Sequence, residues 1–175
     1  QDIVTAPIGD FSLNNVGSTD RLDEMEFHFP LATSTNLVQF LVEKGYLEGA
    51  ANKALLLQGQ MTGLIDLLFR HDGKYYIADY KSNFLGSSLT DYNGESVAHA
   101  MQSHQYHLQY LIYTVAVHRM LKQKLAGYQY ETHMGGAYYL FLRGMNPQDS
   151  RGIFFTKPDL ETVLRLDELL GGVSG

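Results

Sequence analysis

The stretch GLIDLLFRHDGKYYIADYK, residues 63–81, decides the fold. It holds two apolar segments around Asp72-Gly73, and Asp-Gly between such segments is the strongest short-range signal for a β-hairpin. A two-residue loop would set Asp66 directly across from Asp79, with Cβ atoms about 4.5–5.5 Å apart. Lys81 follows Asp79 by two residues and therefore points to the same face of the sheet. The sequence thus predicts two carboxylates and an ammonium group close together.

The surroundings of these two aspartates favour a bound cation. Both faces of the hairpin carry apolar side chains, which is typical of central strands that are covered on both sides. Two carboxylates about 5 Å apart, at an effective dielectric near 20, repel by about 3 kcal/mol, and a shared proton or a cation relieves this repulsion. Oxygen ligands suit Mg²⁺, Mn²⁺ or Ca²⁺, and a lysine beside such an ion is a recurrent arrangement in phosphoryl transfer. The alternative is an ordinary solvated ion pair, and a loop of three or five residues would break the facing pair.

The rest of the chain alternates between strand and helix signals. The sequence predicts further strands at 25–31, 54–60, 138–143 and 152–156, and helices over about 36–44, over 95–124 with an interruption near His104, and between Pro158 and Gly171. This order predicts one α/β domain, with a central mixed β-sheet flanked by helices. We expect the domain to cover residues 24–175, after an irregular, acidic lead-in over residues 1–23.

Composition excludes several classes of protein. The chain has 175 residues, a length typical of one domain, and no cysteine, which excludes a disulfide scaffold, a thiolate zinc site and a cysteine nucleophile. The net charge of −6 argues against binding of nucleic acid by charge alone. Residues 1–50 hold eight acidic and two basic residues, whereas residues 103–143 hold four basic residues and one acidic residue. Short apolar runs predict no membrane span. The lack of a secretory signal, of an initiator Met and of cysteine predicts an intracellular fragment of a longer chain.

Several motifs together resemble one nuclease family. The segments Gly63-Leu64-Ile65-Asp66 and Asp79-Tyr80-Lys81-Ser82, with Gln109 and Tyr113 four residues apart on a helix, resemble the motifs of RecB-type nucleases. These are the C-terminal nuclease domains of exodeoxyribonuclease V β subunits, within the restriction-endonuclease-like superfamily that carries the D…(D/E)xK signature. The resemblance covers about residues 24–170. It implies a restriction-endonuclease-like core and a Mg²⁺-dependent deoxyribonuclease module of a helicase–nuclease that processes double-strand breaks for recombinational repair.

The resemblance also implies roles for individual residues. Asp66 and Asp79 would bind the metal together with the main-chain carbonyl of Tyr80, and Lys81 would be the catalytic lysine. Gln109 and Tyr113 would border the site, although their spacing alone also fits an ordinary polar contact between helix and sheet. Mn²⁺ would substitute for Mg²⁺, and Ca²⁺ would bind. A glycosidase that uses the two aspartates as acid and base is a third interpretation, which the neighbouring lysine disfavours.

The upstream part of the chain departs from the family pattern. RecB-type nucleases carry a further metal-binding histidine on a helix before these strands, and residues 1–23 contain no histidine and no clear helix signal. We therefore expect the chain to lack the first helix of the domain. The implied partners are DNA, RecC- and RecD-like subunits and the RecA recombinase, with no membrane, in the bacterial cytoplasm. The alternative is a catalytically incompetent fragment that serves as a protein-interaction module for a partner subunit or RecA.

A basic stretch follows the Gln109–Tyr113 pair. Arg119, Lys122 and Lys124 are expected at the end of the long helix and are candidates for contact with DNA phosphates. The alternative is a solvated last turn whose positive charges complement the helix dipole.

Overall fold

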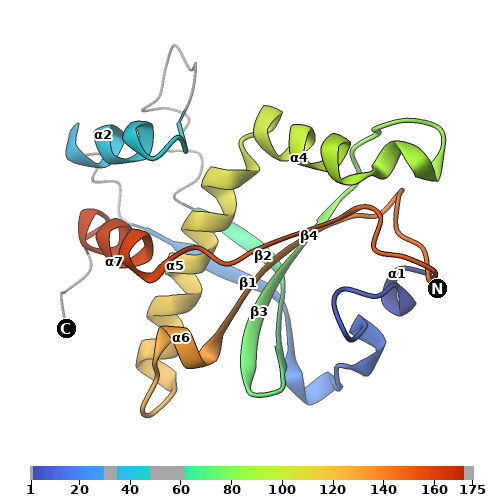
Figure 1. Ribbon diagram of the computed structural model, residues 1–175. Coiled ribbons are helices and arrows are strands. Elements are labelled where there is room, and N and C mark those ends of the chain that lie inside the picture. Colours follow the sequence, from blue (N-terminus) through green and yellow to red (C-terminus); the bar gives the residue numbers. More distant parts are fainter. Residues whose placement is uncertain (1, 30–34, 48–61, 172–175) are drawn as a thin grey trace.

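The computed structural model describes residues 2–29, 35–47 and 62–171. Its centre is a five-stranded sheet in the order β1-β2-β3-β4-β5, in which β3 and β4 run parallel and the other neighbours run antiparallel. The strands are β1 (Arg21–His28), β2 (Thr62–His71), β3 (Lys74–Lys81), β4 (Met134–Phe141) and β5 (Ile153–Thr156). Helices flank this mixed sheet (Figure 1), which confirms the predicted α/β class.

The β2–β3 turn has the predicted length. Asp72 and Gly73 have φ angles of 46° and 75°, the left-handed values that a two-residue type I′ turn requires at both positions. The ladder pairs His71 with Lys74 and runs on in the same register. The sequence-based register is therefore confirmed from His71–Lys74 to Leu67–Ala78, where the ladder ends.

The helices also follow the sequence signals. The predicted interruption near His104 is present, because Gln105 has a φ of 56° and separates two helices. Asn93 caps the first of these by accepting hydrogen bonds from two amides of its first turn. The main helices are α2 (Thr35–Glu43), α4 (Gly94–Ser103), α5 (Tyr106–Lys124) and α7 (Leu160–Leu169), and the short ones are α1 (Asp2–Thr5) and α6 (Tyr130–His133). The strand predicted over 54–60 lies outside the described residues.

α5 is the helix that covers the sheet beside the two aspartates. Its buried side chains share one hydrophobic core with residues from β2, β3 and β4, among them Leu68, Ile77 and Tyr139. α4 and α7 contribute to the same core, and Figure 1 shows α7 on the side of α5 that faces away from the sheet. α5 is therefore buried over most of its circumference and packs against the sheet. In the described part of the chain, no helix is long and apolar enough to cross a membrane.

The N-terminal segment covers the second face of the sheet. It packs there against Leu67, Phe69 and neighbouring residues of β2–β4 through Ala6, Ile8, Phe11, Leu13 and Val16, and Figure 1 shows it on the side of the sheet opposite α5. The sequence-based description of residues 1–23 as an irregular lead-in to the domain omits this contribution of the segment to the core. Its apolar residues follow neither the helical nor the strand period, so periodicity gives no sign of their burial.

This role of the N-terminal segment leads to a stability prediction. Leu13 is 1% exposed, so Leu13→Ala should lower the free energy of unfolding by about 2–5 kcal/mol, through lost burial and the cavity that remains. Val4→Ala is the matched control, because Val4 is 39% exposed and its truncation should change stability by only about 0.5 kcal/mol. Urea denaturation of both variants measures the difference. Equal midpoints for the two variants would show that the segment contributes little to the core.

Candidate active site

The two aspartates lie where the β2–β3 ladder ends. The last ladder pair is Leu67 with Ala78, so Asp66 and Asp79 are the next residues on their strands. Asp66 does not continue the ladder; its Oδ2 accepts a hydrogen bond of 2.8 Å from the Tyr80 amide. Because the N–H and C=O groups of one strand residue point to the same edge, the Tyr80 carbonyl also faces β2. Asp66 thus contacts β3 one residue after Asp79, but the two aspartates do not form the ladder pair that the sequence predicts.

An irregularity in β2 sets the direction of Asp66. Ile65 and Leu68 belong to the core beneath α5, whereas Leu67 belongs to the core beneath the N-terminal segment. Strict alternation would place Ile65 and Leu67 on one face, so the strand changes phase at Asp66. On β1, Glu24 stands opposite this point, where the ladder skips one pair, and has a φ of 59°. The distortion releases Asp66 from the sheet pairing and lets its carboxylate reach β3.

Asp79 is a buried carboxylate with one cationic neighbour. It is 3% exposed, and burial is the main cause that raises its pKa to about 6, with Asp66 acting in the same direction. The Lys81 ammonium opposes this rise, and its Nζ lies 2.5 Å from Asp79 Oδ1. Apart from that contact, Oδ1 has no hydrogen-bond partner among the described residues. Asp79 therefore has unused capacity to bind positive charge.

Lys81 is held from α5 and from β4. Its Nζ donates to Gln109 Oε1 at 3.0 Å and lies 4.1 Å from the ring centroid of Tyr106 and 5.3 Å from that of Tyr139. The hydroxyl of Tyr139 donates to the same Gln109 oxygen at 2.9 Å. Gln109 thus fixes the direction of the ammonium, and the two rings stabilise its charge through cation–π contact.

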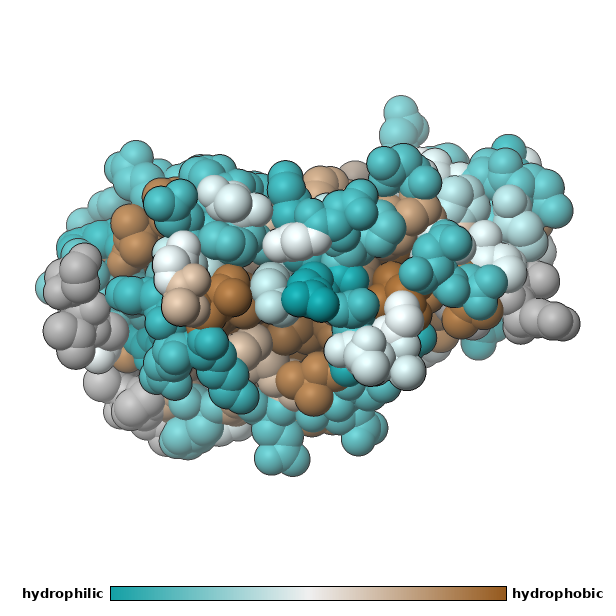
Figure 2. All heavy atoms as spheres, turned by 90° about the horizontal axis from the view of Figure 1, so that it is seen from below, coloured by the Kyte–Doolittle hydropathy of each residue, from teal (hydrophilic) through white to brown (hydrophobic). Residues whose placement is uncertain are grey.

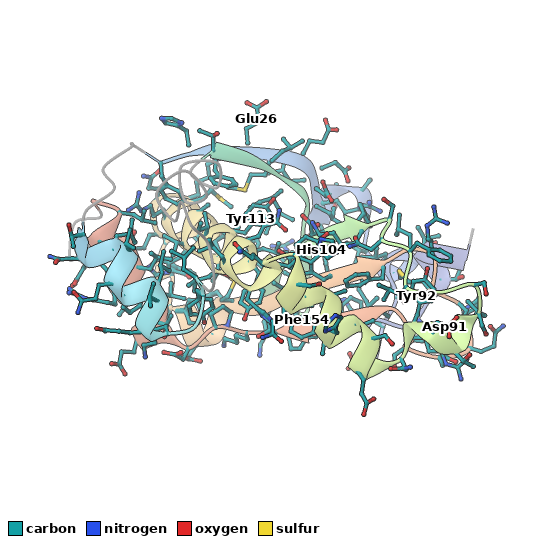
Figure 3. All side chains as sticks on the ribbon, turned by 90° about the horizontal axis from the view of Figure 1, so that it is seen from above. Glu26, Asp91, Tyr92, His104, Tyr113 and Phe154 are labelled. Carbon is teal, nitrogen blue, oxygen red and sulfur yellow. The ribbon has the colours of Figure 1, made fainter. Side chains whose placement is uncertain are left out.

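Tyr113 lies between α5 and strands β1 and β2, as Figure 3 shows. Its hydroxyl donates to the Leu64 carbonyl at 3.2 Å. Burial, and then the charges of Asp79 and Asp66, raise the pKa of Tyr113, so its hydroxyl stays protonated and serves as a donor. Gly63 gives the room for this arrangement, because a Cβ there would lie 2.9 Å from the Phe27 ring.

Two further residues, Tyr106 and Tyr139, belong to this site beyond the predicted ones. Tyr106 precedes Gln109 by three residues and shares its helix face, which is a usable sequence signal. Tyr139 reaches the site because β4 pairs in parallel with β3 and sets it beside Asp79. A parallel pairing of strands so far apart in sequence leaves no local signal.

The three basic residues near the end of α5 lie apart from the aspartates. Arg119 pairs with the Asp167 carboxylate and donates to two carbonyls at the C-terminal end of α7, so a contact of Arg119 with DNA is not supported. Lys122 and Lys124 are exposed. Lys124 lies roughly 20 Å from Gln109 along α5, at 1.5 Å per residue. A phosphate contact stays a prediction for these two lysines.

A separate cavity of about 340 Å³ lies between the ends of β1 and β2 and the last turns of α5. Apolar side chains such as Leu22 and Met120 line it, together with Arg70 and Lys124, and Figure 2 shows apolar side chains exposed on the face that carries the β2–β3 turn. Its lining does not include Asp66, Asp79 or Lys81. The cavity is therefore no part of the carboxylate site.

Comparison with known families places this mixed sheet in a nuclease superfamily. Residues 16–169 match the family model described as the PD-(D/E)XK nuclease superfamily, and the chain belongs to that superfamily. In this sequence, Asp79-Tyr80-Lys81 has the form of the (D/E)xK element.

Among curated proteins, the chain is similar to part of RecBCD enzyme subunit RecB from several bacteria. It is 37% identical to RecB of Escherichia coli (strain K12) over 180 residues, which cover 98% of this chain and 15% of that protein. It is 41% identical to RecB of Haemophilus influenzae over 159 residues, 89% of this chain and 13% of that protein. RecB of Mycolicibacterium smegmatis is 32% identical over 192 residues, 91% of this chain and 18% of that protein. The chain thus spans less than a fifth of the length of these relatives, and the predicted resemblance to RecB-type nucleases is confirmed.

Proposed function

We propose that the chain is a Mg²⁺-dependent nuclease module that hydrolyses phosphodiester bonds in DNA. The observation that carries this proposal is the meeting of Asp66, Asp79 and Lys81 at the end of the β2–β3 ladder, with the Tyr80 amide bound to Asp66. Membership of the PD-(D/E)XK nuclease superfamily supports the reaction class. The two carboxylates would hold the metal, and Lys81 would act on the attacking water or on the charge that develops on the phosphate.

The donor set fits a hard divalent cation. Asp66, Asp79 and the Tyr80 carbonyl all offer oxygen, and Asp79 Oδ1 has no partner besides the Lys81 ammonium among the described residues. Mg²⁺ prefers oxygen ligands and commonly binds through one or two carboxylates and several waters. When bound, it would supply positive charge to a phosphate oxygen and lower the pKa of water. We expect Mn²⁺ to replace Mg²⁺ and Ca²⁺ to bind at the same donors.

Lys81 is suited to its assigned role by the contacts that it makes. An ammonium group has three N–H donors, and the described residues account for two of them, through Asp79 and Gln109. The third is available to water or to a phosphate oxygen. The rings of Tyr106 and Tyr139 lie within cation–π distance of the ammonium and stabilise its charge.

The similarity to RecB supports a place for this module in a larger assembly. The relatives are named as subunits of the RecBCD enzyme. We place the chain within a helicase–nuclease that processes double-strand breaks, with RecC- and RecD-like subunits and DNA as partners. Docking of the RecA recombinase on the same module is part of this proposal.

Degradation of linear DNA by the purified chain tests the proposal. We expect cleavage that needs Mg²⁺, stops in EDTA and returns when Mn²⁺ is added. Cleavage that is unchanged in EDTA would contradict the metal-dependent mechanism, and an intact substrate in Mg²⁺ and in Mn²⁺ would contradict the nuclease assignment for this chain.

A second candidate function is a protein-interaction module without catalysis. The observation that favours it is the departure from the family pattern upstream, where residues 1–23 contain no histidine to complete the proposed metal site. Calorimetric titration separates the two functions. Binding of Mg²⁺ or Mn²⁺ in the millimolar range supports the nuclease, whereas no binding in that range supports the interaction module.

A further inference from the structure

Phe84 is the most exposed large apolar side chain of the described residues, at 68%. It follows the end of β3 and lies three residues after Lys81, so its backbone is within about 10 Å of that of the lysine. A single exposed apolar residue is ordinary on a protein surface. The position beside the proposed catalytic lysine, and the way in which the neighbouring backbone is held, distinguish Phe84 from such a residue.

The backbone on both sides of Phe84 is fixed by one buried side chain. Tyr92 is 2% exposed, and its hydroxyl donates to the carbonyl of Asn83 at 3.4 Å and accepts from the amide of Leu85 at 3.3 Å. Figure 3 shows Tyr92 on the loop that leads from β3 to α4. The Phe84 ring is therefore presented to solvent by an anchored turn.

This turn is also connected to the ammonium of Lys81. The side-chain Oδ1 of Asn83 accepts a hydrogen bond of 3.1 Å from the hydroxyl of Tyr106, the tyrosine whose ring lies under Lys81 Nζ. His104 stacks on the same tyrosine ring, with centroids 5.4 Å apart. The Phe84 turn and the lysine are thus positioned by the same side chain.

A cation accompanies the exposed ring. The guanidinium of Arg143 lies 6.0 Å from the Phe84 ring centroid, and its Nε donates to the Ser82 carbonyl at 2.9 Å. Within the described residues, Arg143 has no carboxylate partner among the ion pairs. Its charge is therefore available to an anion.

An exposed aromatic face beside a free arginine is the arrangement that proteins use to hold single-stranded nucleic acid, with stacking for a base and charge for the backbone. We propose that Phe84 and Arg143 form a stacking site for one nucleobase of a single DNA strand next to the scissile phosphate. The phosphate of that nucleotide lies toward Arg143. This inference rests on the proposed nuclease function, and it names the form of DNA and the contact that position the strand.

Binding of labelled oligothymidine to the purified chain in EDTA tests the inference apart from cleavage. Phe84→Ala should weaken binding by about 5-fold to 150-fold, the range that corresponds to the loss of one base stack. Phe84→Tyr, which keeps the ring, should bind like the wild type. Phe155→Ala is the matched control, because Phe155 is also exposed, at 47%, but lies on β5, and its loss should not change binding.

An abasic oligonucleotide of the same length completes the test. The wild type should bind it more weakly than oligothymidine, and Phe84→Ala should bind the two alike, because the base has no ring left to stack on. Equal binding of oligothymidine by the wild type and Phe84→Ala would overturn the inference even if the chain cleaves DNA. If Phe84→Ala bound oligothymidine more weakly and the wild-type chain did not cleave DNA, the inference would be supported and only the proposed nuclease function would be refuted.

Discussion

Replacement of Asp79 by asparagine is expected to abolish DNA cleavage and, without divalent metal, to make the folded chain more stable. Asparagine removes the charge of the buried carboxylate, and an uncharged amide is a poor ligand for Mg²⁺. Loss of several kcal/mol of charge stabilisation corresponds to a rate decrease of about a thousandfold. A gain of stability together with a loss of activity distinguishes a functional residue from a structural one.

The gain of stability depends on pH in a definite direction. Burial raises the pKa of Asp79 from 3.8 to about 6, so between these values the folded state holds more protons than the unfolded state, and stability falls as pH rises. Above pH 6 the free-energy cost of keeping the charged Asp79 carboxylate buried levels off at about 3 kcal/mol. Asparagine resembles the protonated carboxyl group and carries no such penalty. The variant should therefore exceed the wild type by up to about 3 kcal/mol near pH 7 and match it near pH 4.

Urea denaturation at the two pH values in EDTA, with DNA cleavage measured in parallel in Mg²⁺, checks this prediction. Asp159→Asn is a control of opposite sign, because hydrogen bonds from Thr162 lower the pKa of Asp159. That variant should keep its nuclease activity and lose stability at neutral pH, where the wild-type carboxylate is charged. Cleavage by Asp79→Asn at the wild-type rate would contradict the proposal that Asp79 binds the metal.

The placement of Asp66, Asp79 and Lys81 on one hairpin is predictable from sequence because it depends on local chemistry. Asp72-Gly73 permits one tight turn, and that turn fixes the register of the ladder as far as the Leu67–Ala78 pair. The direction of Asp66 is not predictable in this way. It depends on a distortion shared with Glu24 of β1, a strand that is far away in sequence.

The aromatic surroundings of Lys81 depend on long-range contacts in the same way. Tyr139 reaches the lysine only through the parallel pairing of β3 with β4, and no residue next to it in sequence indicates that partner. The apolar residues of the N-terminal segment follow no regular period, because the segment packs against the sheet largely as an irregular chain. Local patterns thus identify the charged groups of the site, and tertiary packing decides how they are held.

Lys81→Met is expected to slow DNA cleavage by about a hundredfold to a thousandfold, the usual effect of removing one preorganised charge from a reacting centre. Methionine keeps an unbranched apolar side chain but removes the ammonium and with it the cation–π contacts with Tyr106 and Tyr139. The affinity for Mg²⁺, measured at mildly alkaline pH, should not fall with the cleavage rate. In the wild type the Lys81 ammonium competes with Mg²⁺ for Asp79 Oδ1, and the variant lacks this competitor. We therefore expect Mg²⁺ to bind the variant at least as tightly as it binds the wild type, while the chemical step fails.

Lys157→Met is the matched control for this variant. Lys157 also combines an ion pair, with Glu131 at 3.0 Å, and a ring contact, with Tyr130 at 5.2 Å, but it lies outside the carboxylate site. Its replacement should leave both cleavage and Mg²⁺ affinity unchanged. Single-turnover cleavage and calorimetry on the two variants separate the roles of the lysine. If Lys81→Met lost Mg²⁺ binding together with activity, Lys81 would be a support for the metal site, and if it cleaved at the wild-type rate, the ammonium would have no part in the reaction.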